Sequence, residues 1–373
     1  MISYSTQCIE ESDLKAVSDA LQQRFLTCGP LIDEFETKIA EYVGAKYAVA
    51  VSSGTAALHT ACYVAGVADQ DEVITSPITW VSSANAAFYC GGAPKFADID
   101  TCTYNVTAKE IEKQITEKTK VIMPVDYAGQ PCDMDAINAV AKEHNLIVIE
   151  DAAEALGSKY KGRKVGSLAD MSIFSFHAIK PLTTCEGGMI VTDNEDYYNA
   201  AKSFRTYGIV KTQEGIDREE PWVSDQVGLG PNYRLTDIQC ALGLSQLHRL
   251  DSMLEKRKRI AGIYEKELMD FGNIVLPHHA PGCEGNWYMY PILVNGDKRK
   301  EYYIKLREAG IGVGVCFYPV YKNTYYQKNG YKDIWCENAE WFYARVLNLP
   351  VHAKITDHEL DYIVQMVKKI IKE

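Results

Sequence analysis

Hydrophobic and polar positions follow two periods along this chain, and together they predict strands that alternate with helices. Apolar residues stand at every fourth position from Leu31 to Val43 and Gly44 follows them, which predicts a helix over 31–43. Short apolar runs predict β-strands at 47–51, 72–75, 95–97, 120–125, 146–149, 172–176 and 188–192. Helical patterns lie between several of these runs, at 80–90, 108–116 and 134–143. We therefore expect an α/β fold with a mostly parallel sheet that helices cover on both faces.

The pattern changes after about residue 250 and predicts a second, smaller domain. A long charged helix over 236–262 is followed by a strand at 287–294, a helix at 298–309, a strand at 311–317 and two final helices. We expect a large α/β domain over residues 1–250, which includes an N-terminal arm, and a small α+β domain over residues 251–373.

The charge of the chain argues against a nucleic-acid partner. The 373 residues include 39 Lys plus Arg against 50 Asp plus Glu, which gives a net charge of −11. Binding to a phosphate backbone needs a basic stripe, and this composition does not favour one. No segment approaches the ~18 apolar residues of a membrane helix. The opening segment MISYSTQCIEESDLK also lacks the basic and then apolar pattern of a secretory signal. We expect no membrane contact.

The cysteines argue for a cytoplasmic protein without a metal site. Eleven of them are scattered from Cys8 to Cys336, and no C-x-x-C pair is among them. This spacing fits neither a zinc site nor a disulfide framework. We expect reduced thiols that pack as small apolar side chains.

Two nucleotide-binding motifs fail when they are tested against the sequence. Residues 157–162 have the glycine spacing of a P-loop, but Arg163 and Lys164 stand where Lys and Ser or Thr are required. No G-x-G-x-x-G follows a predicted strand, so a dinucleotide site is unsupported as well.

The junction between the predicted strand 47–51 and the Ala-rich helix after it suits an anion. Small residues at Ser53, Gly54 and Thr55 allow a ligand to approach the backbone amides. The start of the helix adds positive partial charge, and the two hydroxyl groups add donors. The alternative is an ordinary helix N-cap with a tight turn.

Two further junctions add a carboxylate and an amine. Asp151 follows the strand 146–149, at the end of a strand where α/β sheets bind ligands, and a carboxylate there suits a cationic ring nitrogen. Lys180 precedes Pro181 between a strand and a Gly-Gly turn, and a desolvated amine in such a place forms an imine with an aldehyde cofactor. Taken singly, these are also typical of an N-cap aspartate and a surface lysine. Together with the phosphate cradle they indicate pyridoxal phosphate (PLP).

Four segments carry a resemblance to a known family. They are VSSGTAAL (51–58), IEDAAEALGS (149–158), FSFHAIKPLTTCEGG (174–188) and NYRLTDIQCALGLSQL (232–247). With them the chain resembles the DegT-type nucleotide-sugar aminotransferases, which are fold type I PLP enzymes, along essentially its whole length. The resemblance implies a homodimer with two shared active sites.

The resemblance also implies roles for individual residues. Lys180 would bond to PLP and move the substrate proton, Asp151 would pair with the ring nitrogen, and Trp80 would stack on the ring or else belong to the core. The cofactor-binding set that it implies is Ser53, Gly54, Thr55, Trp80, Asp151, Glu154, Ser175, Lys180 and Asn232. Asn232 would reach the phosphate from the partner subunit. The substrate-side set is Thr27, His177, Arg234 and Tyr318.

Three positions bear on the substrate. Glu154 stands where many relatives have His or Gln beside the phenolic oxygen of PLP, and an ionised carboxylate there would repel that oxygen unless a proton or water intervenes. Cys316 replaces a His that is usual in the family. His177 is common in relatives that aminate C4 of the sugar, where it either contacts substrate or positions the loop. Arg205, Lys211 and Arg234 are positional candidates for cations that offset the charge of a nucleotide sugar.

Within the family, the segments look most like the pseudaminic-acid pathway transaminases. That similarity implies transfer of the amino group of L-glutamate to UDP-2-acetamido-2,6-dideoxy-β-L-arabino-hexos-4-ulose. The alternatives are other sugar 4-aminotransferases, of the 4-amino-4-deoxy-L-arabinose or GDP-perosamine type, and a non-catalytic regulatory member. A sugar dehydratase of the same fold has His in place of the lysine, and Lys180 argues against it.

Overall fold

The central element is a seven-stranded sheet. The structure is a computed structural model that describes residues 1–211, 217–218, 220 and 222–371. The strands of the sheet are β1 (Tyr47–Val51), β2 (Glu72–Thr75), β3 (Ala93–Phe96), β4 (Thr119–Met123), β5 (Ile147–Asp151), β8 (Met171–Ser175) and β9 (Gly188–Thr192). Their spatial order is β1-β9-β8-β5-β4-β2-β3, and β9 runs antiparallel to both of its neighbours. The other pairs are parallel, so the predicted mostly parallel α/β sheet is confirmed.

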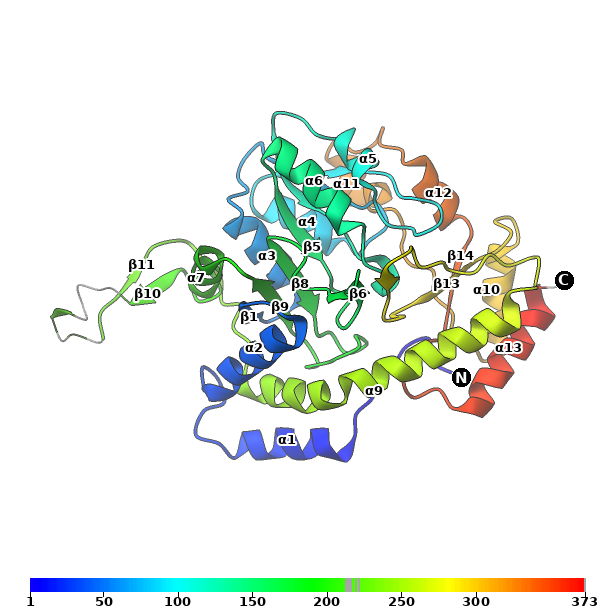
Figure 1. The fold of residues 1–373 in the computed structure, drawn as a ribbon, viewed down its shortest axis with the longest axis horizontal. Coiled ribbons are helices and arrows are strands. Elements are labelled where there is room, and N and C mark those ends of the chain that lie inside the picture. The colour runs from blue at the N-terminus through cyan, green and yellow to red at the C-terminus, as the bar shows by residue number, and fades with distance from the viewer. Residues whose placement is uncertain (212–216, 219, 221, 372–373) are drawn as a thin grey trace.

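Both faces of this sheet are buried. Along β1, Ala48 and Ala50 belong to one apolar cluster while Val49 and Val51 belong to another, as expected when alternate side chains point to opposite faces. The helices of this part are α2 (Pro30–Val43), α3 (Gly54–Val64), α4 (Ser82–Tyr89), α5 (Ala108–Glu112), α6 (Met134–His144) and α7 (Glu195–Phe204), and Figure 1 shows them around the sheet. The helix predicted over 31–43 ends, as expected, at Gly44 in the left-handed conformation.

A smaller unit follows, with a core of its own. The long helix α9 (Asp237–Leu268) runs past the sheet to this unit, where it lies beside α13 (Asp357–Ile371) (Figure 1). The other elements there are β13 (Tyr290–Leu293), β14 (Val346–Leu349) and α10 (Arg299–Glu308). Three short helices, η2 (Val320–Lys322), α11 (Thr324–Lys328) and α12 (Glu337–Tyr343), come from the same part of the sequence, but their buried residues belong to the apolar cluster of the large unit. One apolar cluster draws its buried members from Ile260 to Ile371. The predicted boundary at 250/251 falls inside α9, and the division into two domains stays a prediction.

The strand predicted at 311–317 is wrong. This segment forms only isolated bridges, from Ile311 to Ile2 and from Gly314 to Asn348. The N-terminal arm occupies its edge: Gly312 donates a backbone hydrogen bond to the carbonyl of Ile2. The strand that pairs with β13 is instead β14, which the sequence pattern did not single out. Three short strands, β6 (Lys159–Tyr160), β7 (Arg163–Lys164) and β12 (Cys283–Glu284), form a separate small sheet.

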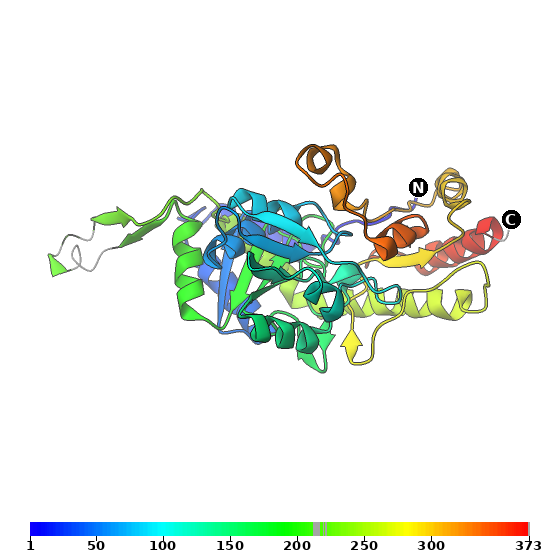
Figure 2. The same ribbon diagram turned by 90° about the horizontal axis from the view of Figure 1, so that it is seen from above.

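A hairpin projects away from the body of the molecule. It consists of β10 (Ile209–Lys211) and β11 (Ser224–Gln226), and it stands clear of the other elements in both ribbon views (Figures 1 and 2). Near the N-terminus, α1 (Glu11–Leu21) packs along α9, and its buried Asp13 accepts hydrogen bonds from Ser245 and Gln246 of that helix. None of the described helices is long and apolar enough to cross a membrane.

Candidate active site

The ends of two strands and the start of one helix meet at one edge of the sheet. Ser175 ends β8 and Gly54 begins α3. They approach so closely that a Cβ on Gly54 would lie 2.9 Å from the Cβ of Ser175. Ser53 caps α3 by accepting a hydrogen bond from the amide of Ala56. The cap and the anion site predicted here are compatible, because the first amides of a helix remain available to a phosphate beyond the cap.

Asp151 lies at the end of β5, buried and held by donors. Ser83 donates to its Oδ2 over 2.6 Å, and the amide of Ala153 donates to its Oδ1 over 3.2 Å. Burial raises the pKa of this carboxyl, whereas Ser83, Ala153 and Lys180 act to lower it. The carboxylate is therefore oriented and is the natural partner of a cationic ring nitrogen.

The amine of Lys180 lies between a carboxylate and an aromatic ring. Its Nζ is 3.5 Å from Oε1 of Glu154 and 4.2 Å from the ring centroid of Tyr288. Burial acts to lower the pKa of Lys180, but Tyr288, Glu154 and Asp151 outweigh it, so the pKa is raised. A lysine with 13% of its side chain exposed is not the surface charge that the alternative interpretation describes.

Glu154 completes the group around the amine. Its Oε2 accepts a hydrogen bond from the amide of Ala128 over 3.0 Å. Burial raises the pKa of this carboxyl, while Lys180 acts to lower it. Burial thus favours the neutral form of this carboxyl, and the neighbouring amine of Lys180 favours its ionised form.

Comparison with known proteins decides what this arrangement belongs to. Residues 7–368 match the model of the DegT/DnrJ/EryC1/StrS aminotransferase family. The chain belongs to this family. The sequence-based assignments to an aminotransferase and to PLP as its cofactor are confirmed, and so is the fold class.

Two curated relatives are similar over nearly the whole chain. The UDP-4-amino-4,6-dideoxy-N-acetyl-beta-L-altrosamine transaminase of Campylobacter jejuni is 39% identical, and the match covers 99% of each protein. The GDP-perosamine synthase of Caulobacter vibrioides is 40% identical over 92% of this chain and 91% of the relative.

Two solved structures have the same fold. Helicobacter pylori PseC, an aminotransferase of pseudoaminic acid biosynthesis, has a TM-score of 0.93 at 34% identity and covers 100% of this chain and 99% of its own. The PLP form of the sugar aminotransferase Spr1654 from Streptococcus pneumoniae has a TM-score of 0.92 at 31% identity, with 100% and 98% covered.

The residues at the sheet edge fit PLP. The narrow approach of Gly54 to Ser175 leaves a cradle, at the start of α3, that any side chain at position 54 would fill. Asp151 offers a buried carboxylate to the ring nitrogen, and Lys180 offers a sheltered amine to the aldehyde. The structure thus brings together a narrow approach suited to a phosphate, a buried carboxylate and a sheltered amine.

The other predicted residues lie around this group with different degrees of exposure. Trp80 is 65% exposed, so it is not part of the core, and its ring lies 6.5 Å from that of Phe317. The side chain of His177 is 47% exposed, and its Nε2 lies 3.9 Å from a carboxylate oxygen of Glu186. Tyr318 is half-exposed. Their contacts with cofactor or substrate stay predictions.

Thr27, Asn232 and the candidate cations come from other parts of the chain. The backbone of Thr27 forms an isolated β-bridge with Thr236, and that of Asn232 forms one with Thr206, beside the projecting hairpin. The guanidinium of Arg205 already has partners inside the protein, because its Nη1 donates to the carboxylate of Glu36 and to the carbonyl of Ala50. The two other candidate cations lie on or near the hairpin. Lys211 is exposed on β10, and the guanidinium of Arg234 lies 5.2 Å from the ring centroid of Tyr207.

Sequence reasoning missed Ser83, Tyr288 and Asn286. Ser83 lies near Trp80 in the sequence, and a hydroxyl at the start of a helix was the only available signal. Tyr288 and Asn286 belong to the smaller unit and reach the site only through the tertiary fold. No local pattern of residues could have assigned them.

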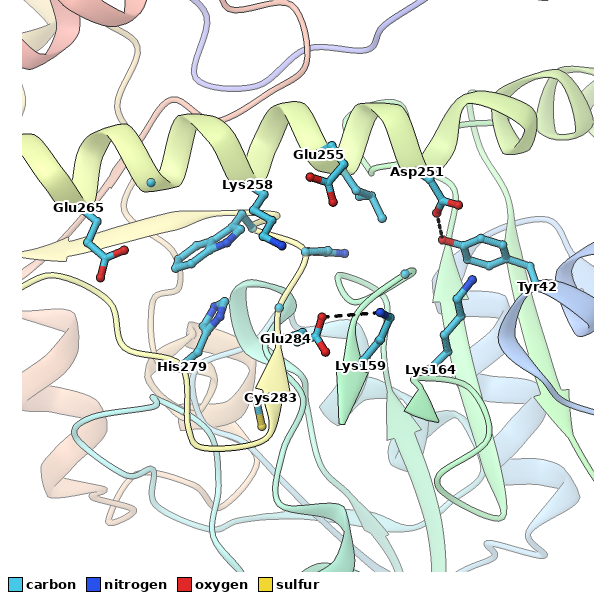
Figure 3. A pocket seen from close by; sticks show the side chains of 16 residues that line it. Tyr42, Lys159, Lys164, Asp251, Glu255, Lys258, Glu265, His279, Cys283 and Glu284 are labelled. Carbon is cyan, nitrogen blue, oxygen red and sulfur yellow. Dashed lines mark hydrogen bonds and ion pairs between the residues drawn. The ribbon is translucent and has the colours of Figure 1, made fainter. Parts of the chain in front are cut away.

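A cavity of about 720 Å³ lies elsewhere, between α9 and the small sheet (Figure 3). Neither Lys180 nor Asp151 lines it. Two of its lysines are already engaged, Lys159 with Glu284 at 3.6 Å and Lys164 over the ring of Tyr42 at 3.3 Å. The chemistry of the residues, and not the size of the hollow, identifies the active site.

Proposed function

We propose that this aminotransferase moves the amino group of L-glutamate to C4 of a 4-keto-6-deoxy nucleotide sugar, UDP-2-acetamido-2,6-dideoxy-β-L-arabino-hexos-4-ulose. The observation that carries the reaction type is the sheltered amine of Lys180 between Glu154 and Tyr288, beside Asp151. The choice of this sugar is based on the sequence around His177 and on the names of two similar proteins, the altrosamine transaminase and PseC.

The alternative substrates are those of other sugar 4-aminotransferases. The GDP-perosamine synthase is as similar in sequence as the altrosamine transaminase, so overall identity does not separate the two. A 4-amino-4-deoxy-L-arabinose type remains open as well. A non-catalytic role is disfavoured by the complete Asp151 and Lys180 pair.

In the proposed reaction, Lys180 transfers the proton, and the carboxylates of Asp151 and Glu154 stabilise positive charge. Bound PLP supplies an electron sink that stabilises negative charge on the carbon next to nitrogen. Lys180 takes a proton from that carbon in glutamate and delivers one to C4 of the sugar, so its amine must be neutral for the first task and protonated for the second. Asp151, oriented by Ser83, holds the ring nitrogen in its cationic form. Glu154 stabilises the protonated amine at 3.5 Å.

The surroundings keep the proton on this path. Glu154 and Asp151 are 7% and 4% exposed, so water has little access to the side of the site where the proton moves. We propose that His177, Tyr318, Thr27 and Arg234 contact the sugar nucleotide; His177 and Tyr318 are half-exposed.

We also propose a homodimer in the cytoplasm, with Asn232 of the partner subunit reaching the phosphate. The projecting hairpin supports this, because Trp222 and Leu229 at its ends are 75% and 87% exposed. Large apolar side chains in such positions are typical of a surface that meets another protein.

The first test is an absorbance spectrum of the purified protein before and after addition of L-glutamate. We expect a yellow PLP band that bleaches as the cofactor takes the amino group. Lys180→Ala should leave the band unbleached, while Lys164→Ala, on a lysine outside the site, should bleach as the wild type does. A protein that stays colourless with added PLP would contradict the proposal.

The second test identifies the sugar. The amino-loaded enzyme is mixed with 4-keto sugars that carry UDP, GDP or dTDP, and the return of the yellow band is timed. We expect the UDP-linked 2-acetamido sugar to restore it fastest. A faster return with a GDP sugar would favour the perosamine-type reaction.

A further inference from the structure

Tyr288 belongs to the smaller unit, yet its ring lies against the reactive amine. It stands shortly before β13, is 8% exposed, and its ring centroid is 4.2 Å from Nζ of Lys180. A cation over the face of an aromatic ring at this distance is attracted by the electrons of the ring, and the attraction is strongest where water is excluded.

Asn286 links the two residues that flank this amine. Its Oδ1 accepts from the amide of Tyr288 over 2.9 Å, and its Nδ2 donates to the carbonyl of Glu154 over 2.8 Å. From α9, the buried Arg257 donates to the carbonyls of Tyr288 and Val351. The backbone that carries the ring is therefore fixed relative to the carboxylate on the other side of the amine.

The amine needs such a support whenever it is not bonded to PLP. A lysine side chain is a flexible stem of four carbons. Its free amine must nevertheless be held in one position relative to the substrate in order to move the proton. We propose that Tyr288 is a positioning residue, whose ring holds the free amine of Lys180 beside Glu154 at the point from which it moves the substrate proton. This inference rests on the proposed function, because it takes Lys180 as the proton carrier.

The pKa of the Lys180 amine offers a way to test this proposal, because it depends on the groups around the amine. The titratable groups that face it are Glu154, Asp151, Tyr288 and Cys316, with Arg257, Tyr4 and Tyr127 behind them. Burial acts to lower the pKa of Lys180, and Tyr288 is the largest of the influences that raise it. Loss of Tyr288 should therefore lower the pKa of the amine.

The test uses the full-length chain without cofactor. Tyr288→Phe keeps the ring and Tyr288→Leu removes it, and the rate of acetylation at Lys180 is followed against pH by mass spectrometry of its peptide. We expect the midpoint to shift to lower pH in Tyr288→Leu, and to lie between that value and the wild-type value in Tyr288→Phe, which keeps the ring. Tyr264→Phe, which removes a buried phenol in the core of the smaller unit, is the matched control and should leave the midpoint unchanged.

A second readout separates positioning from folding. We expect the glutamate-dependent bleaching of the PLP band to slow by about tenfold to a hundredfold in Tyr288→Leu, as when a contact to a charged group is lost, with a near-normal KM for glutamate. An unshifted midpoint in Tyr288→Leu would overturn the proposal. If wild-type PLP fails to bleach, the proposed function fails, and the acetylation arm still decides the role of Tyr288.

Discussion

At the scale of single residues, Asp151 is the group with the clearest chemical task. Asp151→Asn keeps the shape of the side chain but loses the negative charge that we propose as the partner of the ring nitrogen. We expect kcat to fall by roughly a hundredfold to a thousandfold, the usual loss when a group that stabilises charge in the transition state is removed. Ser83→Ala, which removes the 2.6 Å hydrogen bond to Asp151, should cost less. Steady-state kinetics of the three proteins checks the order, and equal losses in both variants would contradict it.

At the scale of elements, the start of α3 depends on having no side chain at Gly54. In Gly54→Ala the new Cβ would meet the Cβ of Ser175 at 2.9 Å. We expect strain of about 1–3 kcal/mol, relieved by a shift of the cradle, and PLP bound about tenfold to a hundredfold more weakly. Gly262→Ala on α9 points into open space, so it should leave PLP affinity unchanged. Equal affinities in a fluorescence titration would argue against a tight cradle.

The ends of β4 and β5 place a second, buried carboxyl pair behind the site. Asp126 and Glu150 are both fully buried, and one oxygen of each has no donor among the residues that the structure describes. Each of the two carboxyls influences the pKa of the other, and burial opposes the charged form of both. Burial raises the pKa of Glu150 from 4.5 to about 7, so a proton stays on the native pair that the unfolded chain has already released.

This pair makes the free energy of unfolding depend on pH. Between about pH 4.5 and pH 7 the native state holds more protons, so its stability should fall as pH rises, by about 1–3 kcal/mol from this pair. Glu150→Gln, whose amide can donate to Asp126, should flatten that slope. Urea unfolding at pH 5 and pH 7.5 measures it, with Glu143→Gln on the surface of α6 as the control. Parallel slopes in all three proteins would rule the pair out as the cause.

At the scale of the whole molecule, the proposed dimer predicts complementation between two damaged chains. Lys180→Ala removes the amine of one subunit, and Asn232→Ala removes the group offered to the other. In a hybrid dimer isolated by two affinity tags, one of the two sites has both residues, so about half of the wild-type activity should return. No gain over the parent variants would mean that Asn232 serves its own subunit, or that the chain acts alone.

Much of the large unit could be read from local patterns. Each predicted strand from 47–51 to 188–192 overlaps an observed one, because burial on both faces leaves continuous apolar runs. Asp151 was predicted for the site because it directly follows such a strand, whereas Ser175 was predicted from the family resemblance. The smaller unit was harder to predict: the segment 311–317 is apolar enough for a strand, but the N-terminal arm covers its edge.

The sequence by itself determined the family and the cofactor, and it predicted the carboxylate and the amine that serve the cofactor, because these residues lie in short motifs at strand ends. Only the tertiary structure decided what surrounds the amine. Tyr288 meets Lys180 across 108 positions of sequence, and Asn286 reaches Glu154 across 132. Such contacts depend on how the smaller unit packs against the sheet, and hydrophobic periodicity, which reports only the face that a residue presents, contains no information about the partner it meets there.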